Sequence, residues 1–470
     1  MGIVYSIEAA DLLTPVSAFL RLSKLSDDPY RLLFESVEGG AARGRYSVIA
    51  LLPDLVWKCR DGKVTLDGKP VEGVPLETLK TIVDESQMEL PAGMPPMIGG
   101  VFGVLGYDMV RQMERLPNAP VNDLGLPEGI MIRPRLFAVF DSVRDELTLA
   151  VPVRGKTTDA EAHALLDQAR AALAAPLGDA RETLPAGTEL APPTSNMTQQ
   201  QFEDHIRKAQ DYIAAGDAFQ IVPSQRFTTP FPLSPLSLYR SLRRVNPAPF
   251  LFVMELEDYA LVGSSPEILV RLRNGEVTVR PLAGTRPRGA DREEDLALEK
   301  ELLADRKELA EHLMLIDLGR NDVGRVSQLG TVEVPEKFVV ERYSHVMHIS
   351  STVTGRIKDG KTAMDALVAA FPAGTLTGAP KIRAMEIIDE LEPTRRGPYS
   401  GCVGYFGADG EMDTCIGLRM AVLKGGNMYV QAGCGVVADS DPNAEFRETQ
   451  AKARALFRAA EIAVATAAKA

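Results

Sequence analysis

Two pairs of glutamates are the feature of the sequence with the clearest capacity for chemistry. Glu308 and Glu311 lie in one helical pattern. Glu445 and Glu448 lie in a second pattern near the end of the chain. Because residues three apart share a helix face, each pair presents two carboxylates on one side. If the two helices face each other, the carboxylates form a site for a hard cation such as Mg²⁺, which prefers oxygen ligands. The same spacing is common on helices that face solvent, so spacing alone also allows both pairs to lie on the protein surface.

The residues after the first pair favour a buried position. An apolar run begins two residues after Glu311 and includes Leu313, Leu315 and Ile316. Burial of this run would carry the neighbouring glutamates toward the interior of the protein.

Three further side chains are candidates for a site. Arg419 lies in an apolar, strand-like segment, where an unpaired guanidinium is costly to bury, so we expect an anionic partner from the protein or from a substrate. Lys452 follows Glu448 by four residues and is either its helix ion-pair partner or a ligand-facing group. His348, three residues after His345, is either a structural histidine or a catalyst.

Two glycine-containing segments resemble nucleotide-binding motifs. Residues 355–362 have the spacing of a phosphate loop, but three of the intervening residues are charged and Asp359-Gly360 predicts a hairpin turn. Residues 433–438 resemble a dinucleotide fingerprint, yet a turn follows them where that motif requires a helix. Both segments therefore favour other roles. The glycines at 433 and 435 indicate a strand whose backbone is closely approached by a ligand or another chain.

The elements that must position these residues are predicted to be mixed. Residues 1–175 contain short β-rich runs and a helical pattern at 158–175, and the Pro- and Gly-rich segment 176–198 predicts a linker. Beyond it we expect helices at 198–215, 236–245 and 291–319, and strands at 218–227, 250–254, 259–264, 267–273 and 276–280. Hairpins predominate, so the prediction is an α+β fold of largely antiparallel sheets flanked by helices.

The composition indicates which kinds of partner and which location to expect. The formal net charge is −12 and no basic run offsets it, so we expect no nucleic-acid partner and favour a small-molecule substrate. No uncharged apolar stretch of about 18 residues is present, so we expect no membrane span. The four cysteines form no CxxC pair, which fits a cytoplasmic protein without disulfides or zinc.

Several of these segments together resemble one known family, the chorismate-utilising enzymes. The resemblance extends from about residue 199 to 465, and its motifs occupy 281–288, 307–317, 342–350, 371–381 and 433–448. Residues 32–40 and 44–47 extend it into the N-terminal part. It implies the fold of that family, with a tryptophan-binding regulatory portion at 1–175, the linker at 176–198 and a chorismate-binding catalytic core at 199–470.

Two positions indicate which reaction the resemblance implies. Members that activate water carry a lysine where this chain has Gln220, and members that use a lysine nucleophile carry it where this chain has Ala283. The implied nucleophile is therefore ammonia, which adds at C2 of chorismate as the C4 hydroxyl leaves, before pyruvate is eliminated to give anthranilate. An aminodeoxychorismate-forming enzyme of the folate pathway stays open as the alternative.

Roles for individual residues are also implied by the resemblance. Glu311 and Glu448 match direct Mg²⁺ ligands, and Glu308 and Glu445 match residues beside them that hold metal-bound water. Catalytic roles fall to Glu308 as general acid for the departing hydroxyl, to His348 in pyruvate elimination, and to Thr375. The residues that match the substrate pocket are Gly284, Thr285, Tyr399, Arg419, Gly433, Cys434, Gly435 and Lys452.

The resemblance further implies a regulator and a partner. The residues that match a feedback site for L-tryptophan are Glu35, Ser36, Pro249, Phe250, Leu251 and Cys415. None of the four cysteines lies in a glycine-flanked nucleophile elbow, so the use of glutamine implies a separate glutamine amidotransferase subunit. We expect the chain alone to use only free ammonia.

Overall fold

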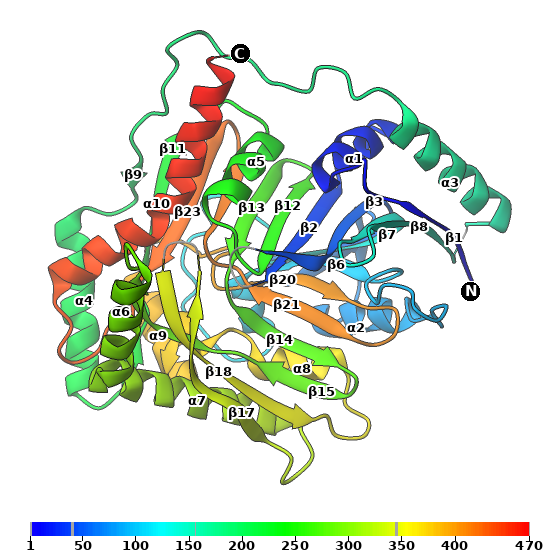
Figure 1. Cartoon of the computed structure of the whole chain (residues 1–470). Helices are drawn as coiled ribbons and strands as arrows, with labels where there is room; N and C mark the ends of the chain where they lie inside the picture. Colours follow the sequence, from blue (N-terminus) through cyan, green and yellow to red (C-terminus); the bar gives the residue numbers. More distant parts are fainter. Residues whose placement is uncertain (1, 39–41, 156, 344–345, 470) are drawn as a thin grey trace.

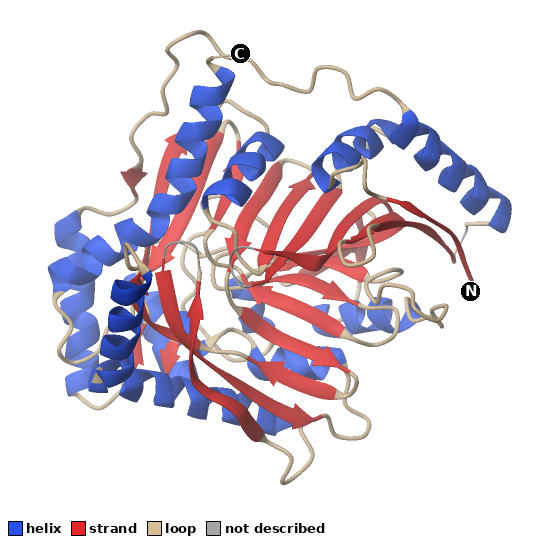
Figure 2. Ribbon diagram, viewed as in Figure 1, coloured by secondary structure: helices blue, strands red, loops and turns tan. Residues whose placement is uncertain are grey.

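Antiparallel strands form the framework of the molecule. The computed structural model describes residues 2–38, 42–155, 157–343 and 346–469, and within these it joins 21 strands into one continuous hydrogen-bonded sheet. Every ladder between named strands is antiparallel, and Figure 2 shows helices around the outside of these strands. The predicted α+β class is confirmed.

The strands vary from two to nineteen residues in length. In chain order they are β1 (Gly2–Ala9), β2 (Arg31–Glu38), β3 (Ala42–Arg60), β4 (Lys63–Leu66), β5 (Lys69–Val71), β6 (Val101–Leu105), β7 (Gly129–Asp141), β8 (Glu146–Val153), β9 (Thr194–Ser195), β10 (Gln220–Ile221), β11 (Ser224–Pro230), β12 (Phe250–Leu256), β13 (Tyr259–Ser265), β14 (Ile268–Arg273), β15 (Glu276–Val279), β16 (Leu282–Pro287), β17 (Glu333–Arg342), β18 (Val346–Arg356), β19 (Gly378–Ala379), β20 (Cys402–Phe406), β21 (Met412–Ile416), β22 (Met420–Lys424) and β23 (Asn427–Gly433).

The helices pack on these strands and on one another. The α-helices are α1 (Pro15–Leu22), α2 (Pro75–Glu85), α3 (Asp159–Ala174), α4 (Gln199–Ala214), α5 (Pro235–Val245), α6 (Arg292–Ala304), α7 (Arg306–Val326), α8 (Ala363–Ala370), α9 (Lys381–Leu391) and α10 (Pro442–Ala467). Short 3₁₀ helices are η1 (Ser23–Leu25), η2 (Tyr107–Gln112) and η3 (Gly374–Leu376). Among the described residues no helix is both long and apolar enough to span a membrane.

Residues 1–175 and the rest of the chain share strands. β2 pairs with β12, and β6 pairs with β20, so the N-terminal portion is hydrogen-bonded directly into the core. The connecting segment 176–198 contains no helix and passes the C-terminal end of α10, where Leu184 N donates to Ala467 O over 2.9 Å (Figure 1). The division of the chain into regulatory and catalytic portions stays a prediction about function.

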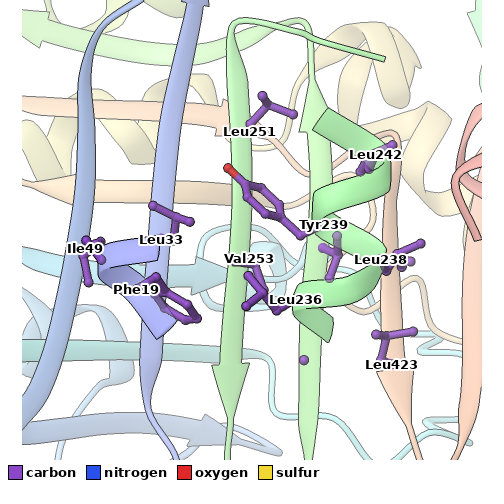
Figure 3. Packing of buried hydrophobic residues seen from close by; sticks show 14 of the residues in the cluster. Phe19, Leu33, Ile49, Leu236, Leu238, Tyr239, Leu242, Leu251, Val253 and Leu423 are labelled. Atoms are coloured by element: carbon purple, nitrogen blue, oxygen red, sulfur yellow. The ribbon is translucent and has the colours of Figure 1, made fainter. Parts of the chain in front are cut away.

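One apolar cluster lies where the two portions meet. Phe19 of α1, Leu33 of β2, Tyr239 of α5 and Val253 of β12 are all buried in it. Figure 3 shows the Tyr239 ring among these side chains, with its hydroxyl directed toward β12 at Leu251. Burial of such surface stabilises the fold by about 25 cal/mol per Å².

Local signals in the sequence predicted many boundaries correctly. Thr198 caps α4 in a capping box with Gln201, as its spacing suggests. Asn274 and Gly275 join β14 to β15 with φ angles of 51° and 74°, the conformation that a tight two-residue turn requires.

Three predicted elements differ in the structure. The long helix at 291–319 is two helices, because Asp305 ends α6 and its carboxylate caps α7 by accepting from the N–H groups of Lys307 and Glu308. The strand at 218–227 is divided into β10 and β11. The turn at Asp359-Gly360 leads into α8 rather than closing a hairpin, and Lys361 pairs with Asp365 of that helix.

Candidate active site

A β-bulge places the first residues of the site. In the ladder between β16 and β18, Ala283 pairs with Ile349 and Thr285 pairs with His348, so Gly284 is the extra residue. Its φ of +63° lies in the left-handed region, which glycine adopts without strain. Gly284 O lies 3.1 Å from His348 Nδ1, and the Thr285 hydroxyl lies 3.0 Å from the same atom.

This environment defines the chemical state of His348. A carbonyl oxygen only accepts hydrogen bonds, so the proton is assigned to Nδ1, which donates to Gly284 O. Nε2 is then unprotonated, and it is buried with no hydrogen-bond partner among the described residues. Burial, with the positive charge of Arg419 nearby, lowers the pKa of His348 to about 4. The imidazole is therefore neutral at physiological pH and presents a free lone pair.

Glu308 lies next to the same bulge. A Cβ atom built on Gly284 would lie 3.2 Å from Glu308 Oε2, so only a glycine admits the carboxylate this closely. Arg286 Nη1 contacts Glu308 Oε1 at 3.4 Å, while Nη2 of the same guanidinium donates to Asp305 and Nε donates to Glu301. These bonds fix the junction between α6 and α7. The structure thus brings Gly284, His348 and Glu308 together, as the sequence predicted.

The four predicted carboxylates influence one another. Burial, followed by the negative charge of Glu308, raises the pKa of Glu311 to about 7, and Glu445 and Glu448 contribute in the same direction. Burial and Glu448 likewise raise the pKa of Glu445, whose Oε2 is buried without a partner among the described residues. The two helices α7 and α10 therefore do present their glutamates to one region.

These carboxylates have the chemistry of a cation site. Among the described residues, no three His, Cys, Asp or Glu side chains already stand in an arrangement that holds a metal ion. The buried oxygen of Glu445 and the mutual repulsion of the carboxylates nevertheless fit a hard divalent cation, which would satisfy the oxygen and neutralise the charge. Glu311, Glu448, Glu308 and Glu445 are the residues that would hold it.

Two cationic side chains, Arg419 and Lys452, lie near enough to His348 for their charges to lower its pKa. Arg419 has a φ of +49° and makes no ion pair with any other described residue. Burial lowers the pKa of this guanidinium. Lys452 Nζ contacts Glu448 Oε1 at 2.7 Å and Gly433 O at 2.9 Å, so it is the predicted helix ion-pair partner and also contacts the glycine strand. The acidic groups that act on Arg419 are those of Tyr343 and Glu267.

Gly433, the last residue of β23, and Gly435 are closely approached, by other residues of this chain rather than by the ligand or second chain that the sequence suggested. A Cβ atom on Gly433 would lie 2.9 Å from the Tyr399 hydroxyl, and one on Gly435 would lie 2.9 Å from Gln220 Nε2. The Cys434 thiol between them is buried, and burial raises its pKa well above the ordinary value, so it is no nucleophile. The backbone of this segment is also held, because Cys434 N donates to Pro223 O at 3.1 Å.

Glu267 is a residue that the sequence analysis missed. It lies between β13 and β14, is buried, and accepts a hydrogen bond from Leu282 N. Burial raises its pKa to about 8, although Thr375 and Arg419 nearby lower it. Thr375 Oγ1 is itself buried without a well-formed hydrogen bond to another described residue. An acidic residue between two apolar strands was the only signal available.

The predicted tryptophan-binding residues also converge. In the ladder between β2 and β12, Ser36 pairs with Phe250 and Glu35 pairs with Leu251. Pro249 directly precedes β12, and Cys415 of β21 is buried in the apolar cluster against which Phe250 packs. The Glu35 carboxylate accepts from Arg243 Nη2 at 2.9 Å and from the Tyr239 hydroxyl. The roles of these residues stay predictions.

Comparison with known proteins gives the family. The family model described as chorismate binding enzyme matches residues 29–458. Anthranilate synthase component 1 of Cereibacter sphaeroides is 53% identical over 98% of this chain and 94% of its own length, and that of Acinetobacter calcoaceticus is 48% identical over 98% and 95%. The crystal structure of anthranilate synthase component I from Streptococcus pneumoniae has 35% identity and a TM-score of 0.80, with 96% of this chain and 98% of that chain covered. The chain therefore belongs to the chorismate-binding enzymes, in the group of anthranilate synthase component 1.

Proposed function

We propose that this chain converts chorismate and ammonia to anthranilate, pyruvate and water. The observation that carries the proposal is the site where Gly284 and Glu308 meet the buried His348, in a chain where Gln220 and Ala283 supply no lysine. With neither a lysine nucleophile nor a lysine base for water, ammonia is the nucleophile. A C–N bond forms at C2, the C4–O bond breaks, and loss of the C2 proton with the C3 enolpyruvyl group makes the ring aromatic.

Two carboxyl groups are candidates for protonating the departing C4 hydroxyl. Glu267 has a pKa of about 8, so it is mainly protonated at neutral pH and can donate a proton. Glu308 has a side chain about one quarter exposed and is held by Arg286. These observations favour Glu267 as the proton donor. Glu308 remains one of the four carboxylates proposed to hold the cation. His348 Nε2, unprotonated and unpartnered, is suited to accept the C2 proton.

The charged groups fit a dianionic substrate. Arg419 binds one carboxylate of chorismate, and the segment Gly433–Gly435, with the Tyr399 hydroxyl, lines the pocket. Mg²⁺, when bound by the four glutamates, would neutralise a second carboxylate that otherwise meets their negative charge.

A partner and a regulator complete the proposal. Anthranilate synthase component 1 relatives carry a name that implies a second component, and we propose that a glutamine amidotransferase subunit supplies ammonia to this chain. L-tryptophan would bind beside the paired strands β2 and β12, at Glu35 and Ser36, and inhibit. All four cysteines are free and buried, which supports a reducing cytoplasmic location.

The test of the proposed function is a comparison of nitrogen sources. Purified chain with chorismate and Mg²⁺ should form fluorescent anthranilate with ammonium and none with glutamine. Glu267→Gln should lower kcat about 100-fold or more, whereas Glu308→Gln should have the smaller effect on proton donation. Equal activity with glutamine and ammonium would contradict the need for a separate subunit.

A further inference from the structure

A buried arginine behind the candidate pocket joins segments that are far apart in the sequence. Arg396 is 4% exposed, and its Nε and Nη2 donate to the carboxylate of Glu392 at 2.9 and 2.6 Å. Its Nη1 donates to Leu376 O at 2.7 Å, and Nη2 also donates to Val222 O at 2.6 Å. Leu376 directly follows Thr375, and Val222 follows β10. Both carbonyls therefore belong to segments that reach the pocket.

The same guanidinium lies against two tyrosine rings. Its carbon is 5.0 Å from the ring centroid of Tyr107 and 5.5 Å from that of Tyr399. Both distances are within the range of a cation–π contact, which is strongest where water is excluded. The hydroxyl of Tyr399 lies against Gly433 in the candidate substrate pocket. Arg396 thus contacts a ring whose other end faces the substrate.

Glu392 extends these contacts to the glycine strand. Its Oε1 accepts from Ser224 N at 2.8 Å and from Ser224 Oγ at 2.7 Å. Ser224 pairs with Gly433 in the ladder between β11 and β23, and its hydroxyl accepts from Gln431 Nε2 at 2.8 Å. The ion pair is therefore hydrogen-bonded on both sides, which a buried pair requires if its desolvation is to be offset.

Tyr399 also has space beside it. A small cavity is lined by Arg396, Gly397, Tyr399 and Gln431. Tyr399 is nevertheless buried, so the contact with Arg396 adds to the restraint that packing places on the ring.

From this geometry we infer that Arg396 is a positioning residue for chorismate binding. It holds the ring of Tyr399, the carbonyl next to Thr375 and, through Glu392, the strand of Gly433 in one arrangement before the substrate arrives. Tyr107, from the N-terminal portion, supports the arginine and thereby contributes to the pocket without touching substrate. The inference rests on the proposed function, since chorismate is the ligand of the pocket.

The first test is Arg396→Lys, which keeps the charge but replaces the planar fork with a single ammonium group. Lysine cannot hold both carbonyls and the carboxylate, so the pocket loosens. We expect the chorismate KM, and the Kd from calorimetry, to rise about tenfold to hundredfold, with kcat at saturation changed far less. The matched control is Arg154→Lys, because Arg154 is equally buried and donates to the carbonyls of Gly99 and Pro134, outside the pocket.

The second test compares two substitutions of Tyr107. Its hydroxyl is buried without a hydrogen-bond partner among the described residues, so only the ring supports Arg396. Tyr107→Phe should therefore keep the wild-type KM, and Tyr107→Leu should raise it. If Arg396→Lys does not fold, the comparison of the two Tyr107 variants tests the positioning role instead.

The outcomes separate a positioning role from a structural one. If Arg396→Lys lowers Tm as Arg154→Lys does but leaves the chorismate KM and Kd unchanged, Arg396 only stabilises the fold and the inference is wrong. Equal KM values for Tyr107→Phe and Tyr107→Leu would likewise overturn the part assigned to the ring. A wild-type chain that forms no anthranilate would instead contradict the proposed function, whatever the result for Arg396→Lys.

Discussion

The carbonyl oxygen of Gly284 lies 3.1 Å from Nδ1 of His348 and thereby fixes which imidazole nitrogen carries the proton. The bulge that aims this carbonyl exists because Gly284 has a φ of +63°. A backbone conformation that favours glycine is in this way coupled to the protonation state of a candidate catalytic base. The same glycine leaves room for Glu308 beside it.

Gly284→Ala should impair both stability and catalysis. A non-glycine residue in the left-handed region costs about 1–2 kcal/mol. The new Cβ would also lie 3.1 to 3.3 Å from Leu302, Glu308 and Ile349. We expect a lower Tm and a kcat reduced about tenfold or more, since His348 loses its alignment. Thermal unfolding and steady-state kinetics measure the two effects.

Gly360→Ala is the matched control for this substitution. Gly360 has a φ of +77° and nothing within 4 Å of its built Cβ, so its substitution strains the backbone without adding a close contact. Its Tm should fall while kcat stays at the wild-type value. A comparable loss of kcat in both variants would show that global destabilisation, not the bulge, explains the effect.

The buried neutral state of His348 predicts a loss of stability in acid. Its pKa is about 4 in the folded protein and about 6.5 in the unfolded chain, so the unfolded state binds the proton first as pH falls. Between pH 6.5 and 4 the free energy of unfolding should therefore fall by about 3 kcal/mol from this residue. Urea unfolding of wild type and His348→Asn across that range measures the difference.

The variant lacks the titrating imidazole, so its stability should decline less steeply over the same pH range. At neutral pH its kcat should fall about 100-fold or more, because the proton acceptor is gone. Parallel stability curves for the two proteins would contradict the buried neutral imidazole.

Arg419→Met should have opposite effects on stability and on binding. The wild-type guanidinium is half-buried and makes no ion pair among the described residues, so its removal should leave the Tm of the ligand-free protein unchanged or higher. The chorismate KM should rise about tenfold to hundredfold, the size expected for loss of a charged hydrogen bond. Arg271→Met is the contrast, because Arg271 pairs with Asp413 at 2.8 Å and its loss should lower Tm without changing KM.

Local patterns predicted those parts of the site that depend on neighbours in sequence. The pairing of Glu308 with Glu311 follows from helical spacing, and α7 does present both to the second pair. The break at Asp305 was missed because aspartate is tolerated inside helices, and only its bonds to Lys307 and Glu308 reveal a cap. The residue type does not specify this capping geometry, so no signal in the sequence marks the break.

Long-range burial explains what the sequence could not reveal. Glu267 differs from many surface glutamates only because strands from distant parts of the chain cover it and raise its pKa to about 8. The contacts of Arg396 similarly reach Val222, 174 positions away in the chain, and Tyr107, which is farther away still. No periodicity or spacing encodes such contacts, so they follow from the assembled fold alone.

Mg²⁺ should stabilise the protein before any substrate is present. A cation that binds only the folded state adds about 2.7 kcal/mol at 100 times its Kd. We therefore expect MgCl₂ to raise the Tm of wild type and to have little effect on Glu448→Gln. The control Glu461→Gln removes an exposed carboxylate from the same helix and should retain the response. An equal response in all three proteins would exclude the four glutamates as the site.

Glu35→Gln should separate inhibition from catalysis. Glu35 is buried between β2 and β12 and pairs with Arg243, outside the pocket that contains Gly284. Tryptophan inhibition should weaken about tenfold or more while the chorismate KM stays unchanged, because a charged contact is lost only at the regulatory position. Glu255→Gln, on the neighbouring strand β12, should remain fully inhibited. Unchanged inhibition in Glu35→Gln would refute the assigned position.

The central claim is that this chain itself converts chorismate to anthranilate with ammonia as the nitrogen donor. The most direct measurement incubates the purified chain with chorismate, Mg²⁺ and ammonium at mildly alkaline pH, and quantifies anthranilate fluorescence and pyruvate together. Anthranilate and pyruvate should form in equal amounts, and both should be lost in Glu448→Gln. Untouched chorismate, or a non-aromatic amino product without pyruvate, would contradict the account.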